Sequence, residues 1–306
     1  MNSISKVLIV GAGAVGAAVA SKIYDTLPSD ISVLAADERF SRYKKSGFIL
    51  NGKRFDFPLS SPDDLNVADL IIVSVKSHHL NDAINTMKNK VGPSTIILSL
   101  LNGISSEETL ANAFGKEKVL LAMILGIDAV RIGNETRFSS SGKIFFGKEL
   151  NNKNSWSPQV RAVADFFDKT SIAYVVPENM TRSLWYKFMI NVGINQASAV
   201  LRAPYRVFQT IPEARSVMES GMREVVALSK ILGTGLNDAD LERWNDTLMA
   251  LGPEGVTSML QDVEAKRKTE VEIFSGTVIE LGKKAGMPTP VNALWFNLIR
   301  TIEKCY

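Results

Sequence analysis

The chain has 306 residues, of which 45% are hydrophobic, and this is enough apolar material for two folded domains or one large one. The formal net charge of only +3 is too small to indicate nucleic-acid or membrane binding, so neither is expected. Because Cys305 is the only cysteine, an internal disulfide is excluded. The two histidines, His78 and His79, are adjacent, which is poor spacing for a shared metal ion, so no metal site is expected. Catalysis is therefore left to Lys, Asp, Glu, Ser or Asn. The low cysteine content agrees with a reducing cytoplasm, where we expect the protein to act.

A glycine-rich turn follows the first predicted strand, Val7–Val10, and precedes a predicted helix over Ala17–Ile23. Gly11 allows a tight turn, Gly13 a close approach of the backbone to a diphosphate, and Gly16 close packing of the helix on the strand. The N-terminal N–H groups of this helix then point at the anion. The alternative is a strand-to-helix turn with a purely structural role. We predict a dinucleotide site whose contacts are Gly11, Ala12, Gly13, Ala14, Val15 and Gly16.

Strand-like and helix-like segments alternate through the first half of the chain, as in a parallel sheet with crossover helices. We predict further strands over residues 31–35, 69–75 and 94–100, the last two apolar on both faces. In such sheets the ligand lies beyond the carboxyl ends of the strands, so Lys76 and Asn102 are placed to meet the cofactor. Asn102 is otherwise part of an ordinary Asn-Gly turn.

The character of the sequence changes in the middle of the chain. The segment Arg131–Gly147 is rich in Ser, Gly and Phe and predicts a β-hairpin that closes the edge of the sheet, whereas the pattern after Pro177 is helical. We therefore predict an α/β fold with two domains: a Rossmann-type dinucleotide-binding domain over residues 1–176 and an all-α domain over residues 177–306. The active site is expected in the cleft between them.

Three helical segments of the second half are prominent. One helix, capped by either Asn179 or Thr181, runs to about Leu201. Ser258 begins a capping-box pattern and opens a long helix that ends near residue 286. The apolar segment Ala293–Ile302 packs either inside the domain or across a homodimer, and the sequence leaves both open.

A polar stripe lies on the first of these helices. Lys187, Asn191 and Asn195 fall at intervals of four, so each is offset by only about 40° from the last, and Ser198 extends the stripe. Because Asn is a mediocre helix former, two Asn residues on one face indicate a binding role. The alternative is a polar seam that packs against the other domain.

A lysine beside two amides suits the reduction of a carbonyl group. As a reduced nicotinamide transfers hydride to a ketone carbon, the ketone oxygen gains negative charge, which an ammonium group stabilises before it donates a proton. Since a free lysine is too weak an acid for this near neutral pH, we expect Lys187 to be partly buried. The two Asn side chains would hydrogen-bond a hydroxyl or carboxylate of the substrate.

Several motifs together are more selective than the glycine turn alone. They are Gly11–Gly16, Val75-Lys76, Leu101-Asn102-Gly103, Trp185-x-Lys187-x-x-x-Asn191-x-x-x-Asn195, Thr257–Asp262 and Lys268-Thr269-Glu270. With these motifs the chain resembles a ketopantoate reductase (2-dehydropantoate 2-reductase) over almost its whole length. The resemblance implies a Rossmann domain followed by an all-α domain like the C-terminal one of 6-phosphogluconate dehydrogenase. It also implies NADPH-dependent reduction of 2-dehydropantoate to (R)-pantoate, a step of pantothenate and coenzyme A biosynthesis.

The resemblance also implies a role for individual residues, with Lys187 as the proton donor. The implied substrate contacts are Asn102, Asn191, Asn195 and Ser258. The residues implied to meet the nicotinamide ribose, or to lie close to it, are Lys76, Asn102 and Glu270. Without the resemblance, Ser258 would be interpreted as a helix cap and Glu270 as a solvated carboxylate.

Two positions depart from the family's pattern. Where the family often has an arginine for the 2′-phosphate of NADPH, this chain has Asp37, which suits the free 2′-hydroxyl of NAD(H). Arg39 and Arg42 are close enough in sequence to serve such a phosphate, so the resemblance favours NADP(H) while Asp37 leaves NAD(H) open. Tyr205 stands where a third substrate-binding Asn is expected, which leaves open a small keto acid other than 2-dehydropantoate.

Two other functions remain open from the sequence. One is a related β-hydroxyacid or opine-type dehydrogenase, which also joins a Rossmann domain to a helical one. The other is a non-catalytic NAD(P)-sensing protein, which needs the glycine turn but not the Lys187 stripe. The expected partner is a small keto acid, and a homodimer is one option for the assembly.

Overall fold

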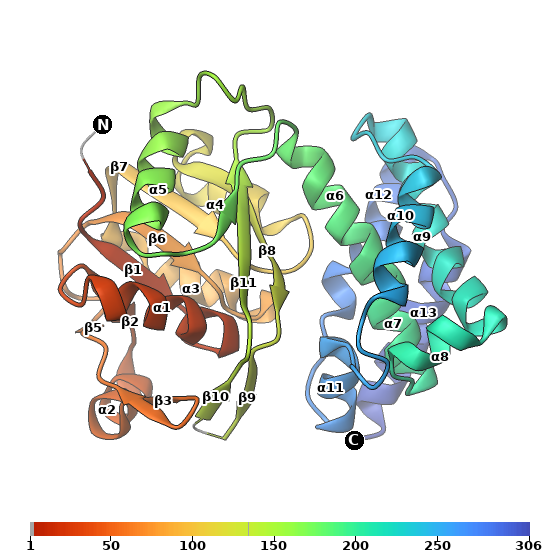
Figure 1. Cartoon of the computed structure of the whole chain (residues 1–306), viewed down its shortest axis with the longest axis horizontal. Coiled ribbons are helices and arrows are strands. Elements are labelled where there is room, and N and C mark those ends of the chain that lie inside the picture. Colours follow the sequence, from red (N-terminus) through yellow and green to blue (C-terminus); the bar gives the residue numbers. More distant parts are fainter. Residues whose placement is uncertain (1–2, 134) are drawn as a thin grey trace. The chain divides into compact units, whose positions relative to one another are not determined.

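The computed structural model describes residues 3–133 and 135–306 (Figure 1). The chain divides into two compact units. The first contains the described residues of 1–102 and 106–180, and the second contains residues 103–105 and 181–306. The predicted division after residue 176 lies close to this one, but nothing in the sequence indicated that residues 103–105 pack with the second unit.

An eight-stranded sheet forms the centre of the first unit, in the order β12-β11-β8-β7-β6-β1-β2-β5. Its strands are β1 (Val7–Val10), β2 (Ile31–Leu34), β5 (Leu59–Ser60), β6 (Ala68–Val73), β7 (Val91–Ser99), β8 (Val119–Ile127), β11 (Ser141–Gly147) and β12 (Tyr174–Val175). From β5 to β8 every neighbouring pair is parallel. This is the Rossmann strand order, and its direction of winding reverses between β1 and β6, where such sheets bind their ligands.

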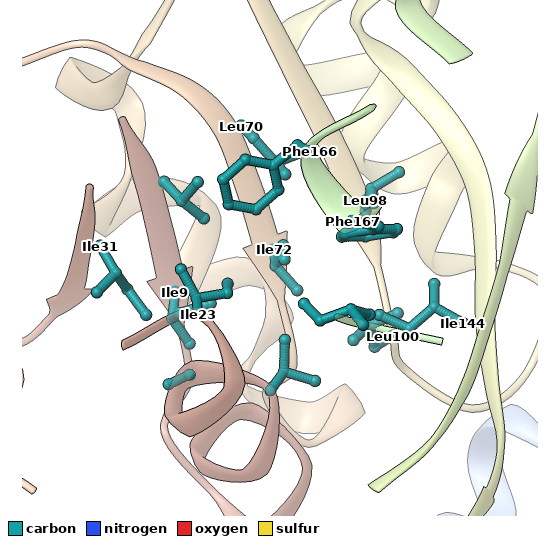
Figure 2. Close-up of a cluster of buried hydrophobic side chains, with 14 of the residues drawn as sticks. Ile9, Ile23, Ile31, Leu70, Ile72, Leu98, Leu100, Ile144, Phe166 and Phe167 are labelled. Carbon is teal, nitrogen blue, oxygen red and sulfur yellow. The ribbon is translucent and has the colours of Figure 1, made fainter. Parts of the chain in front are cut away.

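Helices cover both faces of this sheet. They are α1 (Ala14–Thr26), α2 (Asp37–Ser46), η1 (Ser77–His79), α3 (Leu80–Thr86), η2 (Lys88–Lys90), α4 (Ser106–Phe114), η3 (Lys116–Lys118) and α5 (Pro158–Lys169). On one face, Ile9 and Ile72 of the strands pack with Ile23 of α1 and Phe167 of α5 (Figure 2). On the other face, α3 and α4 contribute to a separate apolar cluster. The predicted Rossmann-type fold is therefore confirmed.

A second, four-stranded sheet belongs to the same unit. It has the order β4-β3-β10-β9, formed by β3 (Phe48–Leu50), β4 (Lys53–Phe55), β9 (Val130–Ile132) and β10 (Glu135–Arg137). The prediction of one hairpin over Arg131–Gly147 was wrong in its pairing, because β10 lies in this sheet while β11 pairs antiparallel with β8. The Ser- and Gly-rich composition indicates strands and turns but does not choose a strand's partner, and β3 pairs with β10 from far away in sequence.

The second unit is helical throughout, as predicted. Its helices are α6 (Met180–Ile190), η4 (Asn191–Asn195), α7 (Gln196–Leu201), α8 (Tyr205–Thr210), α9 (Pro212–Leu232), α10 (Ala239–Met249), α11 (Ser258–Glu264), η5 (Val271–Ile273), α12 (Ser275–Ala285) and α13 (Pro290–Lys304). Their apolar sides enclose one core cluster that includes Phe188, Phe208 and Trp295. Within the part of the chain that the structure describes, no helix has the length and apolar character needed to cross a bilayer.

The long helix predicted from Ser258 to about residue 286 is not found. Helix α11 ends at Glu264, Lys266 follows with a left-handed φ of 52°, and α12 begins at Ser275. The helix cap is also shifted by one residue, because the hydroxyl of Thr257 accepts the hydrogen bond from Leu260 N at 3.2 Å. The capping-box pattern therefore located the start of a helix correctly but not its length.

The apolar segment Ala293–Ile302 lies within α13 and packs partly inside the second unit. Trp295 and Ile299 are buried in the core cluster, whereas Leu294 and Leu298 are 58% and 39% exposed. The residues alternate between these two environments because they lie on different faces of one helix.

Candidate active site

The glycine turn after β1 has the shape that a dinucleotide needs. Gly11 has a φ of 97°, and a Cβ at Gly16 would lie 2.0 Å from the carbonyl oxygen of Gly11. Gly13, by contrast, has nothing within 4 Å of the position of a Cβ. The first and third glycines are therefore required by the fold, while the second leaves open space at the turn for a ligand.

Helix α1 begins directly after this turn. Its N-cap residue is Gly13, which has no side chain to cap the N–H groups of Ala14 and Val15. An anion is the natural partner for such groups, since the positive end of the helix dipole adds to their attraction. The turn therefore fits the diphosphate of a dinucleotide.

Two side chains from outside the turn, one directly after β6 and one on β9, hold the carbonyl groups of the turn. The hydroxyl of Ser74 donates to the oxygen of Gly11 at 2.7 Å, and Nη1 of Arg131 donates to the oxygen of Ala12 at 2.7 Å. Neither residue was predicted. No local pattern distinguishes them, because each contacts the turn from a distant part of the chain.

A cavity of about 500 Å³ extends from the glycine turn past the carboxyl end of β2. Asp37, Glu38 and Arg39 line it, and all three are exposed. Asp37 opens α2 with a left-handed φ of 47°. Arg42 does not line this cavity, and its guanidinium lies 5.3 Å from the ring of Tyr43. Of the two arginines considered for a 2′-phosphate, only Arg39 is at the cavity.

Lys76 and Asn102 follow β6 and β7 at the same edge of the sheet as the glycine turn, as predicted from the parallel order. Lys76 is exposed and directly precedes the 3₁₀ helix η1, while Asn102 is partly buried. His78 and His79 are exposed neighbours in η1. In the described residues no group of three or more His, Cys, Asp or Glu side chains is placed to hold a metal ion.

The polar stripe of the second unit contains a π-helical turn. Lys187 lies in the last turn of α6, and the π-turn η4 then runs from Asn191 to Asn195 before α7 continues the helix. Nδ2 of Asn195 donates to Oδ1 of Asn191 at 3.1 Å. Lys187 and Asn195 are only 8% and 7% exposed. The expected partial burial of Lys187 is thus observed, although the helix is not the regular one that the spacing argument assumed.

Neighbouring residues support the π-turn. Nε2 of Gln196 donates to the carbonyl oxygen of Val192 at 2.8 Å, and a Cβ at Gly193 would lie 2.3 Å from Cε of Met222 in α9. Single π-turns within α-helices are rare and are often found at functional sites. Ser198 does not extend the stripe as predicted, because it is fully buried and donates to Ala203 O at 2.7 Å.

Ser258 is brought to this stripe from α11. Its hydroxyl donates to Oδ1 of Asn195 at 3.2 Å, and the backbone N–H of Met259 approaches the same oxygen at 3.4 Å. Since Thr257 caps the helix, the hydroxyl of Ser258 is not used as a cap. Ser258, Asn195 and Asn191 therefore form one hydrogen-bonded row.

Two further residues of the second unit, Glu270 and Tyr205, have environments that the sequence alone did not indicate. Glu270 is 5% exposed and precedes the 3₁₀ helix η5, so it is not a solvated helix carboxylate. Tyr205 packs against Gly255, where a Cβ would lie 2.9 Å from its ring, and burial raises the pKa of its phenol. Tyr205, the first residue of α8, thus packs against the loop that leads into α11.

A Rossmann sheet with an open glycine turn, joined to an all-α unit with a buried lysine and amides, is the architecture of the two-domain nicotinamide-dependent oxidoreductases. The family model described as ketopantoate reductase PanE/ApbA matches residues 7–150, and the model of its C-terminal part matches residues 179–303. The chain belongs to the ketopantoate reductase PanE/ApbA family and is a nicotinamide-dinucleotide-dependent reductase.

Individual relatives are distant but match over nearly the whole chain. The uncharacterized oxidoreductase YkpB of Bacillus subtilis is 23% identical, over 94% of this chain and 95% of its own length. The 2-dehydropantoate 2-reductase of Pyrococcus horikoshii is 24% identical, over 97% of both chains. A solved D-mandelate dehydrogenase with NADH and anilino(oxo)acetate is 20% identical, with a TM-score of 0.88 over 98% of this chain and 99% of its own, and this similarity shows the shared fold.

Proposed function

We propose that the protein reduces 2-dehydropantoate to (R)-pantoate with NADPH, with Lys187 as the proton donor. The observation that carries this proposal is a hydrogen-bonded row in which Ser258 of α11 joins Asn191 and Asn195, and these two amides lie on the helix that also holds Lys187. Membership of the ketopantoate reductase family supports the choice of substrate and cofactor.

The reduced nicotinamide supplies the hydride when the cofactor is bound. As the keto oxygen gains negative charge, the ammonium group of Lys187 stabilises it and then donates a proton to it. The low exposure of Lys187, 8%, keeps competing water away from this proton transfer. The product is an alcohol, and the lysine regains its proton from solvent before the next turnover.

The hydrogen-bonded row of Asn191, Asn195 and Ser258 is suited to orient the substrate for hydride transfer. Oδ1 of Asn195 is occupied by Ser258 and its Nδ2 by Asn191, so the orientation of the Asn195 side chain is fixed. Among the described residues, Nδ2 of Asn191 has no hydrogen-bond partner, so its N–H groups are available to a hydroxyl or carboxylate oxygen of the substrate. Asn102 is proposed as a further substrate contact.

The cofactor contacts proposed for the first unit are the residues of Gly11–Gly16 and Asp37, with Lys76 and Asn102 toward the nicotinamide ribose. Glu270 of the second unit completes the set. The open position at Gly13 supports the diphosphate contact, and the cavity at Asp37 supports binding of the adenosine part. Membership of the family supports NADPH, while Asp37 in that cavity favours NADH as the alternative.

Replacing Asp37 by alanine is expected to lower the KM for NADPH by about 2- to 5-fold, the range of a surface charge interaction. The reason is that the carboxylate lines the cavity and repels a 2′-phosphate. Steady-state kinetics with NADPH and NADH measures the effect, and Glu38→Ala in the same cavity is the matched control. An unchanged KM ratio for the two dinucleotides would show that Asp37 does not select the cofactor.

A second candidate function is the reduction of a different small keto acid. Tyr205 favours it, because its partly buried phenol, which packs against Gly255 before α11, is larger than the amide expected at this position. The test of both candidates is one screen of keto acids, including 2-dehydropantoate and phenylglyoxylate, for oxidation of NADPH and of NADH. Higher kcat/KM for an aromatic or branched keto acid than for 2-dehydropantoate would replace the first proposal by the second.

The oligomeric state is a separate question, and a homodimer stays a prediction for this protein.

A further inference from the structure

We propose that Arg131 is a further cofactor-binding residue, whose guanidinium contacts the diphosphate of the dinucleotide while it holds the glycine turn. The inference rests on dinucleotide binding at this turn and does not depend on which keto acid is reduced. Arg131 lies on β9, in the small second sheet, and 119 positions separate it from Ala12.

The contact places a positive charge at the turn. Nη1 of Arg131 donates to the carbonyl oxygen of Ala12 at 2.7 Å, and Nε donates to that of Gly133 at 3.2 Å. A guanidinium has five N–H donors, so these two bonds leave three for a ligand. The fork of a guanidinium matches phosphate oxygens well, and hydrogen bonds between the two are charge-assisted.

Carboxylates do not neutralise this charge. In residues 3–133 and 135–306, no Asp or Glu forms an ion pair with Arg131, whereas Arg137 on the neighbouring strand β10 pairs with Glu135 at 2.8 Å. Arg131 is also partly buried, which strengthens its attraction for an anion compared with a fully solvated side chain. A cation of this kind beside a helix N-terminus is a suitable partner for a diphosphate.

Hydrogen bonds fix the residues on either side of the β9–β10 segment, which carries Arg131. Oδ1 of Asp128 accepts hydrogen bonds from the N–H groups of Ser139 and Ser140 at 2.9 and 2.8 Å, which joins the two ends of the β9–β10 segment. Asn51 makes a pair of 2.9 Å hydrogen bonds with the backbone of Phe138. In Figure 1, β9 and β10 continue from the ends of β8 and β11. The arginine is therefore positioned before a ligand arrives, which lowers the entropic cost of binding.

The test compares dinucleotide and ADP binding in three variants by titration calorimetry. For Arg131→Ala we expect the Kd for NADPH, NADH and ADP to rise by about 10- to 100-fold, the range for a charge-assisted hydrogen bond. Arg137→Ala, on the same hairpin, should leave all three values unchanged. Ser74→Ala removes the other hydrogen bond to the turn without removing a charge, and should raise Kd much less.

Salt separates a phosphate contact from a purely structural clamp. If Arg131 contacts the diphosphate, the affinity of the unchanged protein for ADP falls more steeply with salt than that of Arg131→Ala. Equal losses in Arg131→Ala and Ser74→Ala with the same salt dependence would overturn the proposal, as would an unchanged Kd in Arg131→Ala. Because these are binding measurements, failure to reduce 2-dehydropantoate does not affect them. Absence of dinucleotide binding by the unchanged protein would contradict the site itself.

Discussion

Replacing Lys187 by alanine is expected to lower kcat by about 10²-fold or more, the contribution of a general acid. Lys187 is buried on the helix that holds Asn191 and Asn195, and no other amine is proposed for the proton transfer. The Kd for NADPH should stay nearly unchanged, because the proposed diphosphate and adenosine contacts lie in the first unit. Stopped-flow oxidation of NADPH by the keto acid measures the chemical step, and calorimetry measures the Kd.

Lys187→Arg is the control for charge alone. It keeps a positive charge but does not release its proton near neutral pH, so we expect most of the loss in kcat to remain. Full turnover in Lys187→Ala would refute the role of Lys187. A protein that binds NADPH but has no activity on any keto acid, before and after this change, would instead support the NAD(P)-sensing alternative.

Replacing Gly13 by valine is expected to raise the Kd for NADPH by about 10- to 100-fold, the range that corresponds to overpacking at a close contact. Gly13 has an ordinary φ of −74°, and a Cβ there meets nothing within 4 Å. The fold should therefore accept the change, and the new side chain should occupy the space proposed for the diphosphate. Calorimetry gives the Kd, and the Tm of the free protein reports the fold.

Gly16→Ala provides the contrast to this variant. Its Cβ would lie 2.0 Å from the oxygen of Gly11, so α1 must shift and the Tm of the free protein should fall together with the affinity. An unchanged Kd in Gly13→Val would place the diphosphate away from the glycine turn. A lowered Tm in Gly13→Val would show that the open position is needed for folding.

The sheet order could be predicted because its signals are local. Apolar runs such as Val7–Val10 and Ile31–Leu34, separated by helical segments, indicate buried parallel strands, and the structure has them at almost the predicted bounds. The small second sheet could not be predicted in the same way. Its strands β3 and β10 are short, and they pair across a long stretch of chain that leaves no periodic signal.

Part of the candidate site was visible in the sequence for a similar reason. The interval of four between Lys187, Asn191 and Asn195 indicates one helical face, and the hydrogen bond between the two amides agrees with it. The π-turn was not predicted, because an interval of four fits a regular α-helix, and the close packing of Gly193 on Met222 is seen only in the folded chain.

Contacts between residues that are distant in sequence were predicted only where the family resemblance supplied a motif, and otherwise were not predicted. Ser258 was assigned to the substrate site by its family motif, and the structure places its hydroxyl 3.2 Å from Asn195. Arg131 had no such motif, and nothing near it in sequence indicates that its guanidinium contacts the glycine turn. A site residue that has no motif and contacts the site from a distant part of the chain can be identified only from the folded structure.

The most direct test of the role of Lys187 is a crystal structure of the protein with a nicotinamide dinucleotide and a keto acid bound. The proposed role predicts Nζ of Lys187 at hydrogen-bond distance, about 2.7–3.2 Å, from the keto oxygen, with the nicotinamide ring facing the keto carbon. A structure in which this amine points into bulk water, away from the keto oxygen, would contradict it.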